Sequence, residues 1–61
     1  MLVKEIEDFL NNNQWNEAIQ LIKNIPQPLS DEETAALAWC YSRNAEYENA
    51  INLYDDMIQR Q

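Results

Sequence analysis

The sequence predicts an all-α fold of four helices, arranged as two stacked antiparallel helical hairpins. The chain of 61 residues contains no glycine, and its two prolines, Pro26 and Pro28, fall in one short segment near the middle. On either side of that segment, apolar residues recur at intervals of about three and four, which is the spacing of one helical face. We therefore expect a single domain over residues 1–61, with the first hairpin in 1–27 and the second in 28–61.

The first hairpin is expected to contain helices over residues 2–10 and 15–25. Three consecutive asparagines, residues 11–13, separate them. Asparagine tolerates the left-handed conformation that ends a helix, and it also caps the next one. Pro26 ends the second helix because proline lacks the backbone N–H that a helix needs. The predicted apolar face consists of Leu2, Val3, Ile6, Phe9 and Leu10 in the first helix and of Trp15, Ala18, Ile19, Ile22 and Ile25 in the second.

The second hairpin begins with a helix-start signal at Ser30. Ser30 followed by Glu33 is the pattern of a capping box, and the three carboxylates after Ser30 suit the positive end of a helix dipole. We expect the fourth helix to begin near Glu46, and on its outer side Asp56 and Arg60 have the spacing of a helical ion pair. Its predicted apolar face consists of Tyr47, Ala50, Ile51, Tyr54, Met57 and Ile58.

Part of the second hairpin repeats the first at an offset of 32 residues. The segment WNEAIQLI, residues 15–22, matches YENAINLY, residues 47–54. Phe9 and Tyr41 match at the same offset. Self-similarity with a period of roughly 20 to 50 residues is typical of helical repeat arrays. We therefore expect the two hairpins to be structural repeats.

The second repeat resembles a tetratricopeptide (TPR) repeat. The resemblance is carried by Leu37, Ala38, Tyr41, Tyr47, Ala50, Ile51 and Tyr54. It implies that Ala38 and Ala50 lie where two helices cross, since small residues let helices approach closely. It also implies that Tyr41, Tyr47 and Tyr54 are core residues. The first repeat matches more weakly, and there we expect the alanine equivalent to Ala50, which is Ala18, to be buried as well.

The chain departs from the family pattern at several positions. Asn13 and Ala45 stand in the turns where the family usually has glycine, and Thr34 replaces a large aromatic residue. These departures suggest either a divergent pair of repeats or the N-terminal part of a longer repeat protein.

Composition argues against several classes of function. The chain has 11 acidic and 4 basic residues and a net charge of −7, so we expect neither nucleic acid nor a membrane as partner. With one cysteine, Cys40, and no histidine, it lacks a disulfide pair, the usual zinc ligands and a nucleophile–base pair. We therefore predict that the protein is not an enzyme, has no metal or cofactor, buries Cys40 as a packing residue, and is cytoplasmic.

Trp39 does not belong to the predicted packing face. It follows Ala38 by one residue, which on a helix is a rotation of about 100°. The TPR resemblance implies that this direction is the concave side of the repeat, and an indole beside the guanidinium of Arg43 suits a peptide anchor. The predicted binding face consists of Ala35, Trp39, Ser42 and Arg43 in the second repeat and of Glu7 and Leu10 in the first. We therefore predict a TPR-like adaptor or scaffold that binds a peptide or a partner helix.

Three other interpretations stay open at this point. Trp39 could pack against a neighbouring helix and be structural. The protein could self-associate through its C-terminal helix, where Leu53 lies off the main apolar face and would form an open surface. A small acidic inhibitor or immunity-type protein, which masks a basic surface, is also compatible with the charge.

Overall fold

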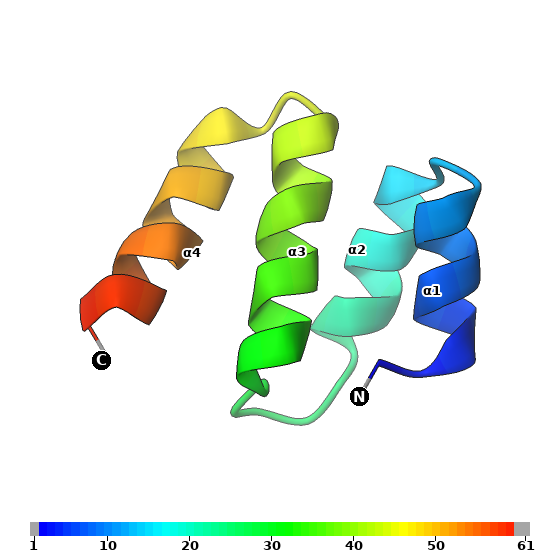
Figure 1. The fold of residues 1–61 in the computed structure, drawn as a ribbon, viewed down its shortest axis with the longest axis horizontal. Coiled ribbons are helices and arrows are strands. Elements are labelled where there is room, and N and C mark those ends of the chain that lie inside the picture. Colours follow the sequence, from blue (N-terminus) through cyan, green and yellow to red (C-terminus); the bar gives the residue numbers. More distant parts are fainter. Residues whose placement is uncertain (1, 60–61) are drawn as a thin grey trace.

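The computed structural model describes residues 2–59, which form an all-helical fold. The helices are α1 (Lys4–Asn11), α2 (Trp15–Lys23), α3 (Asp31–Arg43) and α4 (Tyr47–Gln59). They follow one another in chain order, with α1 packed on α2, α2 on α3 and α3 on α4, and successive helices run in opposite directions (Figure 1). The predicted all-α fold of four helices is confirmed. Arg60, and with it the predicted Asp56–Arg60 pair, lies outside the described residues.

The repeat in the sequence extends to the backbone of the two inter-helix turns. Asn13 (φ 59°) and Ala45 (φ 62°) both adopt the left-handed conformation, 32 positions apart. In the first turn the N–H of Gln14 donates to the carbonyl of Phe9 at 2.8 Å, and in the second the N–H of Glu46 donates to the carbonyl of Tyr41 at 2.8 Å. Both turns are therefore the same type of helix ending, in which a left-handed residue satisfies carbonyls of the last helical turn.

The start of α3 confirms the capping box predicted at Ser30. The N–H of Glu33 donates to Ser30 Oγ at 3.1 Å, and the N–H of Ser30 donates to Glu33 Oε1 at 2.8 Å. Thr34 is buried, and its hydroxyl donates to the carbonyl of Ser30 at 2.9 Å. The segment that follows the two prolines is thus anchored to α3 by side-chain as well as backbone hydrogen bonds.

The core lies where α1, α2 and α3 meet. Its buried residues are Ile6, Ala18, Ile19, Ile22, Ala36, Leu37 and Cys40. Cys40 is fully buried, as predicted, and burial raises the pKa of its thiol to about 11. Ala18 and Ala50 are also buried, as the repeat predicts. Ala38 of α3 is fully buried too.

Two predictions about α4 are wrong. Tyr47 and Tyr54 are not core residues but are 63% and 40% exposed, whereas Leu53 is partly buried and packs against the core. The reason is geometric: α4 contacts α3 through the face that carries Ala50 and Leu53. Residues 47, 51, 54 and 58 lie roughly 90° around the helix from that face. They point away from α3.

Candidate protein-binding surfaces

The first candidate surface is a cluster of Trp15, Trp39 and Arg43. The guanidinium carbon of Arg43 lies 5.5 Å from the centre of the Trp39 ring and 5.8 Å from that of Trp15. Both distances are within the range of cation–π attraction. Trp39 is 49% exposed and is not among the side chains that pack on the core, whereas Trp15 does pack on the core. Arg43 therefore joins an exposed indole to one that is held by the fold.

The junction between α2 and α3 positions this cluster. The side-chain amide of Asn44 donates to Asn16 Oδ1 at 2.9 Å and to Glu46 Oε2 at 2.9 Å. These bonds connect the end of α3 to the first turn of α2 and to the start of α4. The last turn of α3, which carries Arg43, is thereby held beside Trp15.

The other residues of the predicted binding face have different surroundings. Ala35 is exposed and Ser42 is half-buried on α3. Glu7 is exposed on α1, which packs against α2. Leu10 is partly buried and packs on the core, so part of its side chain serves the fold.

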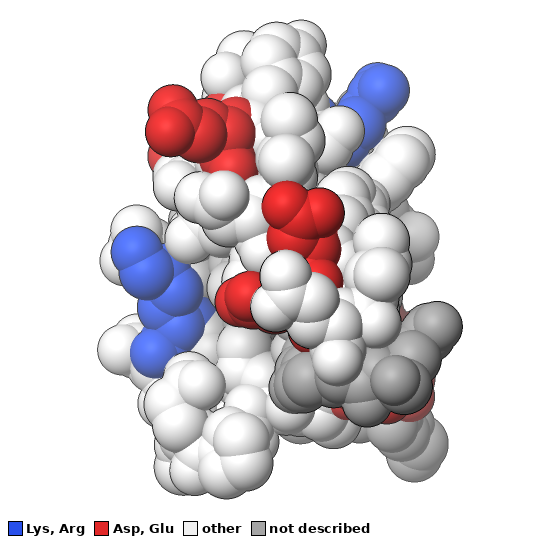
Figure 2. All heavy atoms as spheres, turned by 90° about the vertical axis from the view of Figure 1, so that its left-hand side faces the viewer, with Lys and Arg blue, Asp and Glu red and all other residues white. Residues whose placement is uncertain are grey.

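The second candidate surface is an apolar stripe along α4. From the sequence, its residues were placed on the apolar face of the fourth helix, and its two tyrosines were predicted to be core residues. The stripe consists of Tyr47 (63% exposed), Ile51 (58%), Tyr54 (40%) and Ile58 (66%). We call these four residues the α4 stripe. Viewed from the α4 side, most of the surface is uncharged, with acidic groups standing within it and basic groups at its margins (Figure 2). Four large apolar side chains in one row exceed the scattered apolar residues normal for a protein surface.

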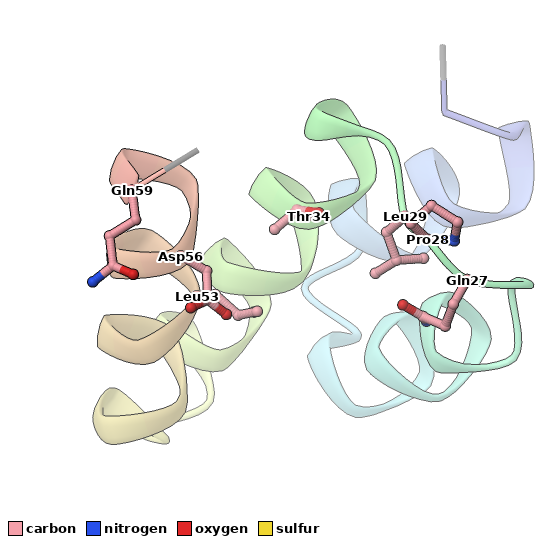
Figure 3. A pocket seen from close by; sticks show the side chains of 7 residues that line it. All are labelled: Gln27, Pro28, Leu29, Thr34, Leu53, Asp56 and Gln59. Atoms are coloured by element: carbon pink, nitrogen blue, oxygen red, sulfur yellow. The ribbon is translucent and has the colours of Figure 1, made fainter. Parts of the chain in front are cut away.

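A third feature is an open hollow of about 470 Å³ between the proline segment and the last turns of α4. Pro28, Leu29 and Leu53 supply apolar walls, and the side chains of Leu29 and Leu53 lie on opposite sides of it (Figure 3). Gln27, Asp56 and Gln59 supply its polar lining. Sequence reasoning did not find this hollow, because it depends on how the linker and α4 are placed in space.

The described residues contain no group of three or more histidine, cysteine, aspartate or glutamate side chains arranged to hold a metal ion. Within the same residues, no helix has the length and apolar character needed to cross a membrane. Among the described residues, the large exposed apolar side chains are Val3, Trp39, Tyr47, Ile51, Tyr54 and Ile58.

Comparisons with protein-family models, with curated proteins and with solved structures found no match. The TPR resemblance accordingly remains a prediction from the sequence.

Proposed function

We propose that the protein is a protein-interaction module that binds a peptide or helix of a partner through the surface around Trp39. The observation that supports this best is the half-exposed indole of Trp39, held beside Arg43 and outside the core. Tryptophan and arginine are the side chains most enriched among residues that dominate binding energy at protein interfaces. Burying the exposed half of an indole on a partner is favourable because apolar surface leaves water.

The cluster also indicates which groups of a partner it would bind. A guanidinium in cation–π range of aromatic rings still has N–H donors, and these bind carbonyl or carboxylate oxygens. The indole provides an adjacent flat apolar surface. The surface therefore suits a peptide that presents an apolar side chain next to a carboxylate or an exposed backbone carbonyl.

Two further properties agree with such a module. Arg43 already lies within cation–π range of two rings, so less side-chain entropy is lost when it binds a partner. The single cysteine is a free thiol, which is usual in a reducing compartment such as the cytoplasm. We place the protein there as part of the proposal.

The proposal is tested with peptides selected against the wild-type protein from a random display library. Each selected peptide is titrated against the wild type, Trp39→Ala and Arg43→Ala by fluorescence anisotropy. We expect Trp39→Ala to raise the Kd about 30-fold, which corresponds to roughly 2 kcal/mol, a typical loss for a dominant interface residue. The matched control is Asn52→Ala, which truncates an exposed residue of a different helix that lies outside the α4 stripe.

Urea unfolding of the same variants separates binding from folding. We expect Trp39→Ala to keep the unfolding midpoint of the wild type within the small change normal for surface substitutions. If Trp39→Ala instead lowers the midpoint strongly, the residue is structural and the proposal fails. It fails equally if the selected peptides bind Trp39→Ala as tightly as they bind the wild type.

A further inference from the structure

We propose that the α4 stripe is a second docking site, separate from Trp39, and that its occupant is an amphipathic helix of a partner protein with lysine or arginine along one edge. The four side chains of the stripe recur at steps of three and four over residues 47–58 and are all exposed. A straight row of this length fits the apolar face of another helix.

The first repeat shows what packs against the equivalent face in this fold. The α4 stripe corresponds, 32 positions earlier, to a face of α2 that includes Ile19 and Ile22. On α2 these positions are 3% and 0% exposed, whereas their counterparts Ile51 and Tyr54 are 58% and 40% exposed. On α2 these residues belong to one buried cluster with Ile6 of α1 and with residues of α3, and α2 packs against both helices. The same face of the same structural unit is therefore already paired with a helix once in this molecule.

The side chains that α3 contributes to that core indicate what a partner helix would present to the α4 stripe. Ala36, Leu37 and Cys40 of α3 belong to the same buried cluster as Ile19 and Ile22. Two of the three are small, which permits close approach of the two helix axes. Tyr54 of the α4 stripe is larger than its counterpart Ile22, so small residues are favoured opposite it.

Acidic residues beside the α4 stripe favour a partner helix with basic side chains. Glu48 and Asp55 directly follow Tyr47 and Tyr54, and each lies about 100° around the helix, along the edge of the stripe that is away from α3. Both are exposed, and α4 itself carries no lysine or arginine between residues 47 and 59. The two carboxylates are seven positions apart, which is about 10 Å along the axis. Two basic side chains spaced by two turns on a partner helix would therefore face them.

A second copy of this chain fits the stripe less well. Two α4 helices packed antiparallel about a two-fold axis would bring Glu48 of one copy near Asp55 of the other on the same edge, and like charges destabilise such contacts. Each copy also has a net charge of −7, which opposes association in any orientation.

A head-to-tail arrangement of copies is also disfavoured. In it, α1 of the next copy would take the position that α3 takes on α2. The α1 residues equivalent to Ala36, Leu37 and Cys40 are Lys4, Glu5 and Asp8, all exposed and charged. Such a face would bury charges on an apolar stripe at a considerable free-energy cost. A basic amphipathic helix of a different protein avoids both difficulties.

The test uses two synthetic helical peptides of about 20 residues, a length that spans the stripe. Both have the same alanine- and leucine-rich apolar face, and they differ by lysine or glutamate at the edge positions. We expect the lysine peptide to bind the wild-type protein at least about tenfold more tightly than the glutamate peptide, with the preference weakening as salt is raised.

Two matched variants locate the site. Ile51→Glu places a charge in the stripe, and Asn52→Glu adds the same charge at the next, exposed position outside it. We expect Ile51→Glu to lose binding of the lysine peptide by at least about tenfold and Asn52→Glu to retain it, although both add the same attraction for lysine. Trp39→Ala should bind the lysine peptide like the wild type. Circular dichroism confirms that each variant is folded.

A charge reversal keeps the test decisive even if Ile51→Glu does not fold. The double variant Glu48→Lys with Asp55→Lys changes two exposed residues, and we expect it to prefer the glutamate peptide. Three results overturn the proposal: equal or absent binding of both peptides to the wild type, unchanged preference in the double variant, or a wild-type dimer in sedimentation equilibrium that Ile51→Glu dissociates. The last result would assign the stripe to a second copy.

Discussion

Helices α2 and α4 have closely similar sequences, but equivalent faces of the two helices differ in burial. Trp15, Ile19 and Ile22 of α2 are covered to different degrees, and the two isoleucines are core residues. The equivalent face of α4 is exposed. Ala18 and Ala50, the alanines directly before Ile19 and Ile51, are both buried. One face of the repeat is therefore buried by its own hairpin, and the other is buried where a further helix packs on it.

The difference follows from the neighbours of each helix. Helix α2 packs between α1 and α3, whereas in the described part of the chain α4 packs on α3. An apolar stripe adds stability to the folded chain only when something removes it from water. On α2 the stripe stabilises the fold, and on α4 the same kind of stripe is available for intermolecular contact.

The largest expected effect comes from truncating equivalent residues of the two stripes. Ile22→Ala should destabilise the protein by about 2–5 kcal/mol, because it deletes fully buried methyl groups and leaves a cavity. Tyr54→Ala should change stability far less, since Tyr54 is substantially exposed. Urea denaturation measures both. Equal losses at the two positions would show that the α4 stripe is covered in the isolated protein, in conflict with the comparison.

Substitutions of the two buried alanines should cause similar losses of stability, unlike truncations in the two stripes. Ala18→Leu and Ala50→Leu each add bulk at a closely packed helix contact, and each should cost about 1–3 kcal/mol. Thermal unfolding of the two variants measures this. Ala35→Leu, a change of the same size at an exposed position of α3, is the control and should have little effect. If Ala50→Leu leaves the unfolding temperature unchanged, α4 does not approach α3 closely.

The stability of the protein should also depend on pH through Cys40. Cys40 lies in α3 and belongs to the buried core, whereas its counterpart in α1 is the exposed Asp8. Burial raises the pKa of the Cys40 thiol from 9.0 to about 11. The folded chain therefore holds the thiol proton more tightly than the unfolded chain does. This contribution to stability is present in full below pH 9 and is lost as the pH rises through 11.

The measurement is the free energy of unfolding as a function of pH. We expect the wild type to lose stability more steeply between pH 9 and 11 than Cys40→Ala, which has no thiol to titrate. The difference between the two proteins isolates the contribution of the Cys40 thiol. Parallel curves for the two proteins would contradict the assignment of Cys40 to the core.

Local signals in the sequence predicted the parts of the fold that depend on local interactions. The capping box at Ser30 requires only residues within one helical turn. The left-handed conformation of Ala45 was not predicted, although the TPR resemblance places Ala45 where the family usually has glycine. The burial of Ala50 could be predicted because a small residue marks a close helix crossing in the repeat pattern.

The exposure of Tyr47 and Tyr54 could not be predicted in the same way. Helical periodicity shows that a face is apolar, but it does not show whether another helix covers that face. The error with Leu53 has a related cause, since both its face and the α4 stripe are apolar, and only the packing of α3 decides which one turns inward. Trp39 was predicted to lie off the packing face from register alone, and its partial exposure agrees with that prediction.

The smallest expected effect concerns the two equivalent turns. Ala45 has φ 62°, and a residue with a Cβ atom in this region costs about 1 kcal/mol relative to glycine. Ala45→Gly should therefore stabilise the protein by up to about 1 kcal/mol, which for a domain of this size raises Tm by about 4–8 °C.

Asn13→Gly is the matched control at φ 59°. Asparagine tolerates the left-handed region better than alanine does, so this variant should change Tm less. Because the two turns share their backbone hydrogen bonds, a difference between the variants isolates the side chain from the turn geometry. If Ala45→Gly lowers Tm, the flexibility that glycine adds to the unfolded chain outweighs the strain that it relieves, and the prediction is wrong.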